Sequence, residues 1–311
     1  MNEFELITRL TQSLPTNQNV VLGAGDDCAV LDFGRPDQWL LFKTDAIVEG
    51  VHFTPDTAPE KIGHKALARC LSDIAAMAGT PSAALVTLAL PQPFEAGFIA
   101  AVYAGMNALA QKHGTAIVGG ETTANPERLL LSIALLGWVP RGKAVRRSGA
   151  KVGDVIFVTG ELGGSRAGRH LEFEPRLAEA RWLAENFPLH AMIDLSDGLA
   201  GDLRHVLKAS GVGAELLKRA VPISRAAKLR AKEPAPAARP PFVAALTDGE
   251  DFELLFTVAA ADSMKLLDAW KTQFPRLKLS CIGKIVQAEG ITLRDPNGVQ
   301  PLTAHGYVHF A

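Results

Sequence analysis

Residues 61–78 read KIGHKALARCLSDIAAMA, and this stretch sets the fold class that we expect. Its apolar residues recur at helical spacing, and Gly79 and Pro81 end the pattern. The run ALVTLAL at 84–90 follows closely and is apolar except for Thr87, as in a buried strand. A helix followed at once by a buried strand predicts an α/β lobe.

Similar patterns extend outward from this pair in both directions. The first half contains further strand-like runs at 39–43, 115–118 and 129–138, and a second helical pattern at 95–113. The second half has strand-like runs at 155–160 and 252–258, and helical patterns near 176–187 and 199–210. We therefore expect a two-lobed protein of the α/β (α+β) class.

The segment 140–154 is polar and contains several glycines, so we expect the boundary between the two lobes there. We expect an N-terminal lobe over residues 1–140 and a C-terminal α/β lobe over residues 141–311. The stretch 225–241 is rich in alanine, proline and basic residues, so we expect a surface excursion there.

Composition excludes several classes of protein. The 32 lysines and arginines nearly balance the 33 aspartates and glutamates, so no overall positive field would attract nucleic acid or an anionic membrane. Three cysteines without a CxxC spacing argue against a disulfide framework or a zinc cluster and favour a reducing compartment. The N-terminus lacks a signal-peptide pattern, and no apolar run is long enough to span a membrane. We expect a cytoplasmic protein.

Acidic residues recur in glycine-rich turns and at one helical position, Asp73 in LSDIAAMA. The turns are GAGDD at 23–27, TD at 44–45, GGET at 119–122, DLSDG at 194–198 and DGED at 248–251. Burying an unpaired carboxylate costs several kcal/mol, and few lysines or arginines are adjacent to these acids in sequence. Mg²⁺ prefers carboxylate oxygens and bridges them to phosphates, while glycines let backbone N–H groups approach anionic oxygens.

Each signal also has an ordinary structural explanation. A single acidic turn is usually solvated or caps a helix, and a lone histidine such as His52 usually bonds to backbone. Asp73 is harder to explain in this way, because its helical neighbours are apolar. The chain has no P-loop, no GxGxxG spacing, no GxSxG and no kinase HRD and DFG pair, so no common nucleotide or nucleophile motif competes.

Eight motifs in order resemble those of the thiamine-monophosphate kinases. They are GAGDDCAV, KTDAIVEGVHF, LSDIAAMAGTP, GGETT, RRSGAKVGD, VTGELGGSRAG, DLSDGLAGDL and GEDFELLF, and the resemblance extends from about residue 3 to the closing GYVHF. This family belongs to the superfamily of aminoimidazole ribonucleotide synthetase and selenophosphate synthetase. The resemblance implies ATP-dependent phosphorylation of thiamine monophosphate to thiamine diphosphate with several Mg²⁺ ions. It also implies a two-lobed fold that forms a homodimer through its N-terminal lobes.

The resemblance also assigns roles to individual residues. The implied metal ligands are Asp26, Thr44, Asp45, Asp73, Glu121, Asp194 and Asp197. The implied nucleotide contacts are Tyr103, Gly120, Glu121, Arg147 and Ser196. The implied thiamine monophosphate contacts are His52, Glu250, Asp251 and Tyr307. Among these, Asp73, Asp194 and Arg147 are expected to be closest to the catalytic step.

The sequence departs from the family pattern at three places. Glu121 stands where the family commonly has aspartate, and one extra methylene moves its carboxylate by about 1 Å or more. Lys43 stands where serine is often found, and Arg128 is a possible substitute for an arginine that often follows the GGDT motif.

Two further hypotheses remain open at this point. The chain could be a non-catalytic nucleotide-binding or regulatory protein with the same fold, or a related ATP-dependent synthetase with another acceptor. For the kinase, repulsion between two polyanions is the main barrier, so catalysis consists of charge neutralisation and in-line positioning. A phosphate acceptor has a second pKa of about 6, so no strong general base is needed.

Overall fold

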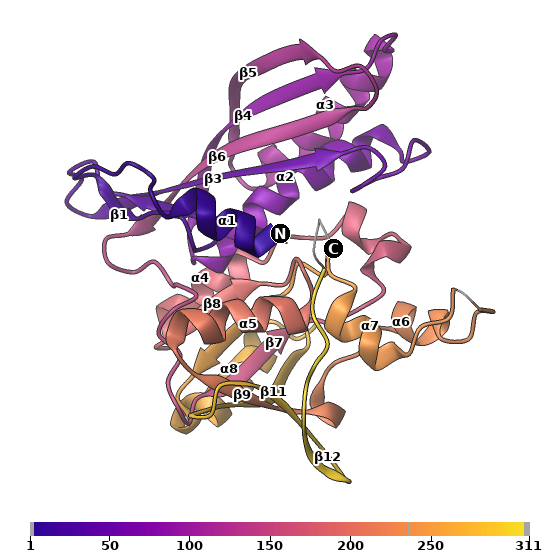
Figure 1. Ribbon diagram of the computed structural model, residues 1–311. Coiled ribbons are helices and arrows are strands. Elements are labelled where there is room, and N and C mark those ends of the chain that lie inside the picture. Colours follow the sequence, from indigo (N-terminus) through magenta and orange to yellow (C-terminus); the bar gives the residue numbers. More distant parts are fainter. Residues whose placement is uncertain (1–2, 236, 308–311) are drawn as a thin grey trace. The chain divides into compact units, whose positions relative to one another are not determined.

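The computed structural model describes residues 3–235 and 237–307 (Figure 1). The last three residues of the GYVHF motif lie outside the described range. The chain divides into two compact units. We call Gln18–Ala144 with Gly168–Leu177 the N-terminal unit, and Met1–Asn17, Val145–Ala167 and Ala178–Ala311 the C-terminal unit. The predicted cut after residue 140 falls where the last strand of the N-terminal unit ends.

The N-terminal unit is built on a six-stranded mixed sheet with the strand order β1-β2-β3-β6-β4-β5. Its strands are β1 (Val20–Leu22), β2 (Ala29–Leu31), β3 (Gln38–Val48), β4 (Thr80–Leu90), β5 (Ala116–Ala124) and β6 (Leu130–Pro140). The β4–β5 pair is parallel and the other neighbouring pairs are antiparallel. Alternate residues of β6 are buried, which indicates that one face of the sheet packs on a core.

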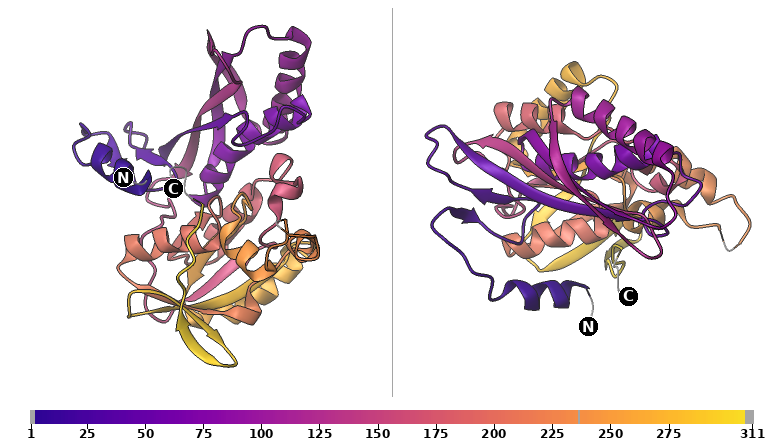
Figure 2. Two further views of the ribbon diagram at one scale, coloured as in Figure 1. Left: turned by 45° about the vertical axis from the view of Figure 1, so that its right-hand side comes forward. Right: turned by 90° about the horizontal axis from the view of Figure 1, so that it is seen from above.

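Helices α2 (Pro59–Ala76) and α3 (Ala96–Lys112) lie side by side on one face of this sheet (Figures 1 and 2). The two helices pack closely because each has a glycine at their contact. A Cβ on Gly63 would collide with the carbonyl oxygen of Val102, and a Cβ on Gly105 would collide with that of Glu60. This packing buries the apolar side of α2 and holds its polar residues in fixed positions relative to β3.

The C-terminal unit contains a seven-stranded mixed sheet with the strand order β13-β12-β9-β11-β7-β10-β8. Its strands are β7 (Val155–Thr159), β8 (Ala191–Asp194), β9 (Gly213–Leu217), β10 (Leu254–Val258), β11 (Leu279–Val286), β12 (Gly290–Asp295) and β13 (Gly298–Pro301). The β12–β9 pair is parallel and the others are antiparallel.

The other helices of the chain are α1 (Glu3–Thr11), α4 (Leu177–Asn186), α5 (Leu199–Ser210), α6 (Arg225–Arg230), α7 (Pro241–Thr247) and α8 (Ser263–Gln273). Helix α5 contributes Leu199, Leu203 and Val206 to a core cluster that also contains Ile193 of β8 and Ile282 of β11. This packing holds the end of β8 and the start of α5, which carry the DLSDG motif.

The structure confirms the helix expected over 61–78 as α2 and the strand expected at 84–90 as part of β4. The other strand-like and helical patterns also coincide with strands or helices. The stretch 225–241 is largely exposed, as expected, but it contains α6 and two arginines that contact an acidic turn. Within residues 3–235 and 237–307, the helices are too short or too polar to cross a membrane.

Candidate functional site

Strand β3 and helix α2 bring four charged side chains of the N-terminal unit together. Lys43 and Asp45 are two residues apart on β3 and so share a face, while Arg69 and Asp73 are one helical turn apart on α2. The Nζ atom of Lys43 lies 2.9 Å from Oδ1 of Asp73. The Arg69 guanidinium forms a bidentate contact with the Asp45 carboxylate, at 3.0 Å from Nε to Oδ2 and 3.3 Å from Nη2 to Oδ1. The result is two adjacent ion pairs.

A third carboxylate joins this group from the turn between β1 and β2. Asp27 is 1% exposed, and one of its oxygens lies within 4.8 Å of an oxygen of Asp73. Asp26, which the resemblance assigned as a metal ligand, is half-buried, and its Oδ1 accepts the N–H of Asp27 at 3.0 Å. The structure therefore adds Asp27 as a candidate ligand, and the role of Asp26 stays a prediction.

The ion pairs shift the pKa values of Lys43 and Asp45 in the directions that favour their charged forms. Burial lowers the pKa of Lys43, but the carboxylates of Asp73 and Asp45 outweigh it and raise that pKa above its ordinary value. Burial raises the pKa of Asp45, but the charges of Arg69 and Lys43 outweigh it and lower that pKa. Few lysines or arginines are adjacent to these acids in sequence. The fold brings cations to Asp45 and Asp73 from a neighbouring element.

Other predicted residues of the N-terminal unit lie elsewhere on the sheet and helices. Thr44 follows Lys43 on β3, so its side chain lies on the opposite face, where its hydroxyl is 3.4 Å from that of Ser132. Glu121 is exposed on the edge strand β5 and accepts the N–H of Thr122 at 3.0 Å. Gly120 permits a close approach to β4, because a Cβ there would collide with the carbonyl oxygen of Val86. The structure does not bring the Thr44 hydroxyl to Asp45, and the roles of Thr44, Gly120 and Glu121 stay predictions.

Tyr103 lies on α3 and is half-buried. Partial burial raises the pKa of its phenol, so the hydroxyl remains protonated at neutral pH and can act as a hydrogen-bond donor. The nucleotide contact that the resemblance implies for Tyr103 stays a prediction.

His52 has a defined ring orientation in a tight turn after β3. Its Nδ1 accepts the N–H of Val48 at 3.0 Å, and its own N–H donates to the Val48 carbonyl at 2.9 Å. Because Nδ1 is an acceptor, the neutral ring carries its proton on Nε2. An Nε2–H group is a suitable donor for an anionic substrate oxygen.

A buried lysine supports this turn from α2. The Nζ of Lys65, a residue that is 0% exposed, donates to the His52 carbonyl oxygen at 2.6 Å and lies 2.7 Å from Nδ1 of His170. His170 belongs to the segment Gly168–Leu177, which also contacts α2 through the Phe173 carbonyl, 2.8 Å from Nε2 of His64. Sequence reasoning missed Lys65 and His170. The available signal was a lysine within the apolar helical pattern at 61–78.

The C-terminal unit gathers three aspartates where β8 leads into α5. Asp194 ends β8 and is 4% exposed, and Asp202 on α5 is 1% exposed. The backbone N–H of Asp197 donates to Oδ2 of Asp202 at 3.1 Å. Burial, together with the charges of Asp197 and Asp194, raises the pKa of Asp202 well above its ordinary value, and the charge of Arg147 opposes this shift. The motif DGLAGD carried Asp202, but sequence reasoning did not assign it a role.

The implied substrate residues Glu250 and Tyr307 meet around one arginine of the same unit. The Nε of Arg166 lies 3.7 Å from Oε2 of Glu250, and the Arg166 guanidinium lies 5.1 Å from the centre of the Tyr307 ring. The N–H of Tyr307 donates to the Asp197 carbonyl at 2.9 Å, and that of Glu250 donates to the Ser196 carbonyl at 2.7 Å. Glu250 has a φ of 56°, a strained conformation for a residue with a side chain. The fold therefore brings Glu250 and Tyr307 next to the DLSDG turn.

The neighbouring acids of the DGED motif bind the protein's own backbone. The Asp251 carboxylate is 1% exposed and accepts the N–H of Gly163 at 2.9 and 3.1 Å. Asp248 accepts the N–H of Gly164 at 3.0 Å, and Arg230 lies 2.9 Å and Arg239 3.0 Å from its carboxylate oxygens. These contacts hold the glycine-rich loop after β7. They give Asp251 a structural explanation, and its predicted substrate contact stays a prediction.

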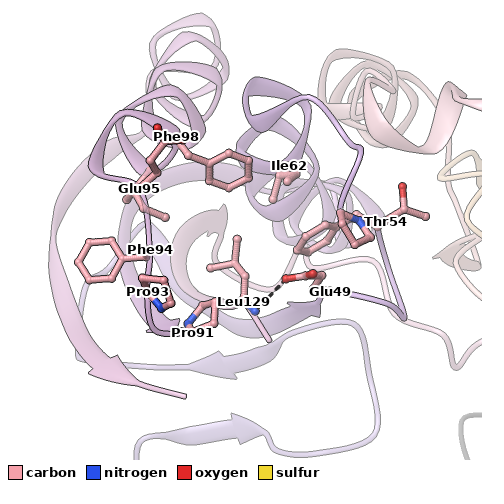
Figure 3. Close-up of a pocket in the computed structure, with 12 residues that line it drawn as sticks. Glu49, Thr54, Ile62, Pro91, Pro93, Phe94, Glu95, Phe98 and Leu129 are labelled. Atoms are coloured by element: carbon pink, nitrogen blue, oxygen red, sulfur yellow. Dashed lines mark hydrogen bonds between the residues drawn. The ribbon is translucent and has the colours of Figure 1, made fainter. Parts of the chain in front are cut away.

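A separate cavity of about 220 Å³ lies in the N-terminal unit near the ends of β3 and β4 (Figure 3). Its lining is mainly apolar and includes Phe53, Phe98 and Pro93. Glu49 lies at its side, with its carboxylate bonded to the N–H of Leu129 at 3.1 Å. None of the residues that the resemblance assigned to the site lines this cavity, and its apolar walls do not suit a polyphosphate.

Comparisons with known proteins agree with this geometry. The model of the AIR synthase related protein, N-terminal domain, matches residues 25–139, and that of the C-terminal domain matches residues 151–295. The thiamine-monophosphate kinase of Rhodopirellula baltica is 40% identical, over 96% of this chain and 93% of its own length. The Escherichia coli K12 thiamine-monophosphate kinase is 37% identical, over 99% of this chain and 98% of its own.

The fold is similar to that of AaThiL complexed with AMPPCP and TMP. The TM-score is 0.83 at 30% identity, and the match covers 99% of this chain and 97% of that chain. Similarity in sequence and fold thus extends over nearly the full length of both proteins. The chain belongs to the thiamine-monophosphate kinase family, within the AIR synthase related proteins.

Proposed function

We propose that this protein transfers a phosphoryl group from ATP to thiamine monophosphate, giving ADP and thiamine diphosphate. The observation that carries the proposal is the presence of a buried carboxylate cluster in each unit, in a chain of this family. Asp27 and Asp73 lie within 4.8 Å of one another in the N-terminal unit, and Asp194 and Asp202 are buried in the C-terminal unit. Polyanion transfer requires positive charge at such clusters.

The donor sets fit Mg²⁺. In the N-terminal unit, carboxylate oxygens of Asp27 and Asp73 lie within 4.8 Å of one another, and carboxylate oxygens at this spacing are ligands that Mg²⁺ prefers. In the C-terminal unit, the pKa of Asp202 is raised by burial and by its two aspartate neighbours, so an added cation would be stabilising there. Mg²⁺ held by these carboxylates would neutralise the polyphosphate and the developing charge on the transferred group.

The chain's own residues would position the acceptor. The Nε2–H of His52 would donate a hydrogen bond to the phosphate of thiamine monophosphate, in the orientation that the Val48 amide fixes. Glu250 and the ring of Tyr307 would receive the cationic thiazolium ring, because the Arg166 guanidinium already occupies a cation position beside both. Arg147 would bind nucleotide phosphate. No general base is needed, since the acceptor oxygen is largely ionised at neutral pH.

Product analysis tests this proposal. Purified protein with ATP, thiamine monophosphate and Mg²⁺ is expected to form ADP and thiamine diphosphate in equal amounts, and to form neither when EDTA replaces Mg²⁺. Unphosphorylated thiamine serves as the control acceptor. Release of ADP with another acceptor, without thiamine diphosphate formation, would contradict the assigned acceptor. Binding of ATP with no turnover on any acceptor would favour a non-catalytic protein.

We also propose that the protein forms a homodimer through the open face of the N-terminal sheet. Phe42 and Leu85 lie on this face, opposite Leu136 and Ala134 of β6, and they are 45% and 48% exposed. Large apolar side chains side by side on an uncovered sheet favour association with a second copy. Light scattering should give twice the chain mass for the wild type and a monomer mass for Leu85→Glu. A monomeric wild type at micromolar concentration would contradict the proposal.

A further inference from the structure

Lys43 lies where the proposed function calls for a divalent cation. Its Nζ is 2.9 Å from Oδ1 of Asp73, and Asp73 is the residue whose carboxylate approaches that of Asp27 to within 4.8 Å. The side chain of Lys43 is 23% exposed and that of Asp73 is 9% exposed. Two carboxylates that approach each other in a buried place repel unless a cation accompanies them. In this structure, a lysine ammonium accompanies them.

The position of Lys43 is set by regular structure. The β3–β6 register pairs Lys43 with Leu135, whose side chain is buried on the face that α2 covers. Lys43 therefore points toward α2, where Asp73 lies. Asp45 is on the same face and is bonded to Arg69, while the ion pair of the Lys43 ammonium is with Asp73. The contact follows from the fold and does not require a flexible side chain to find its partner.

An ammonium and a divalent cation at one carboxylate oxygen exclude each other. The ammonium of a lysine is charged at neutral pH and is a compact point charge, like a small metal ion. A metal ion bound directly to Oδ1 of Asp73 would place two like charges within contact distance, in a partly buried site where solvent screens them poorly.

We propose that the Lys43 ammonium is a permanent counter-ion of the Asp27–Asp73 carboxylate pair and takes the place of one divalent cation there. This inference rests on the proposed function, because it assumes that divalent cations accompany the nucleotide. The protein then needs one fewer metal ion per active site than the same chain without the ammonium. Lys43 acts through Asp73, so it is a positioning residue for the remaining ions.

Counting bound Mn²⁺ tests the inference without reference to turnover. The wild type and Lys43→Met are titrated with Mn²⁺ in the presence of a non-hydrolysable ATP analogue, and free Mn²⁺ is measured by electron paramagnetic resonance. We expect Lys43→Met to bind one more Mn²⁺ per chain than the wild type. Lys112→Met is the matched control, because it removes an exposed lysine paired with Glu174 in the same unit, and its count should not change.

Equal, non-zero counts for the wild type and Lys43→Met would overturn the role of Lys43 and leave the proposed function standing. Absence of Mn²⁺ binding in both proteins would overturn the proposed metal-dependent function as well. If Lys43→Met fails to fold in metal-free buffer, Mn²⁺ addition decides the question. Recovery of the folded protein on adding Mn²⁺ supports the inference, and failure to recover it contradicts it.

Discussion

The two units treat their buried acids differently. In the N-terminal unit, Asp45 and Asp73 lie on regular elements and each binds a cationic side chain, so the pKa of Asp45 is lowered. In the C-terminal unit, Asp194 and Asp202 lie on either side of the loop between β8 and α5, and burial together with the charges of Asp197 and Asp194 raises the pKa of Asp202. In the first cluster, lysine and arginine side chains of the protein balance the charges of Asp45 and Asp73. We expect the acids of the second cluster to depend more on a bound cation.

This difference distinguishes acids that are paired by the fold itself from acids that we expect to be paired by a bound metal ion. A strand and a helix with fixed side-chain spacing can place lysine and arginine opposite aspartate, and that arrangement is stable before any ligand arrives. The loop 195–198 between β8 and α5 has no such repeating geometry, and its Asp197 contributes a backbone N–H to Oδ2 of Asp202. We therefore expect substitutions in the N-terminal cluster to impair activity, and those in the C-terminal cluster to change metal-dependent stability as well.

The largest effect is expected for Asp73→Asn. Removing this charge takes away the ion-pair partner of Lys43 and a proposed metal ligand, so kcat should fall by about 10³-fold, the scale seen when a transition state loses an electrostatic stabiliser. Steady-state ADP release at saturating substrates measures it. Asp32→Asn is the control, since Asp32 pairs with Arg141 elsewhere in the same unit. Normal turnover of Asp73→Asn would remove the basis for a catalytic N-terminal cluster.

A smaller effect is expected at the histidine that supports the His52 turn. His170→Leu removes the ring nitrogen 2.7 Å from the Lys65 ammonium, so we expect KM for thiamine monophosphate to rise about tenfold, or about 1.4 kcal/mol, with kcat and the KM for ATP little changed.

His170→Asn is the matched variant, because its amide oxygen can replace Nδ1, and it should restore most of the affinity. Nitrogen NMR of labelled histidine reports whether His52 keeps its proton on Nε2. A His170→Leu protein with unchanged KM and an unchanged His52 tautomer would show that this contact is only structural.

Asp202→Asn should affect stability in the C-terminal unit. The folded-state pKa of Asp202 is raised, so its ionisation destabilises the fold as pH rises through that value. In EDTA at pH 7.5, the neutral variant should be more stable than the wild type by about 1–2 kcal/mol, and the difference should vanish below the unfolded pKa of about 4. Urea unfolding at several pH values measures this. A destabilised variant at pH 7.5 would mean that Asp202 is already compensated.

The smallest effect is expected at Glu174, in the segment Gly168–Leu177 of the N-terminal unit. The hydrogen bond from His113, with help from Lys112, lowers the pKa of Glu174 to about 2. Its contribution is therefore present above the unfolded value of 4.5 and is lost as pH falls toward about 2. Because Glu174 is 41% exposed, Glu174→Gln should cost only about 0.5 kcal/mol at pH 7. The difference from wild type should shrink as pH falls from about 4.5 toward about 2, and a constant difference over that range would exclude the ion pair as its cause.

The sequence predicted much of the regular structure and part of the site. Asp73 was recognisable because a carboxylate in an apolar helix needs an explanation, and Gly79 and Pro81 marked the helix end. The three-residue strands β1 and β2 were too short to give a periodic pattern, so only the resemblance selected Asp26, and no local pattern pointed to the buried Asp27.

Contacts between distant residues were beyond sequence reasoning for a physical reason. The pairing of Arg69 with Asp45, 24 residues apart, depends on where α2 lies over β3, and no local pattern sets this. Lys65 had a visible signal, a charge within an apolar helical pattern, but its partner His170 lies 105 residues further along the chain. The backbone contacts of Asp251 likewise depend on the docking of a distant glycine loop.

The position of bound metal tests most directly the claim that divalent cations bind the carboxylate clusters together with the nucleotide. Crystals grown with Mn²⁺, a non-hydrolysable ATP analogue and thiamine monophosphate would locate each ion by its anomalous scattering. We predict Mn²⁺ bound to carboxylates of the N-terminal cluster and to Asp194 or Asp197 of the C-terminal cluster, each ion in contact with a phosphate oxygen. A bound nucleotide with no Mn²⁺ on any of these carboxylates would contradict the account.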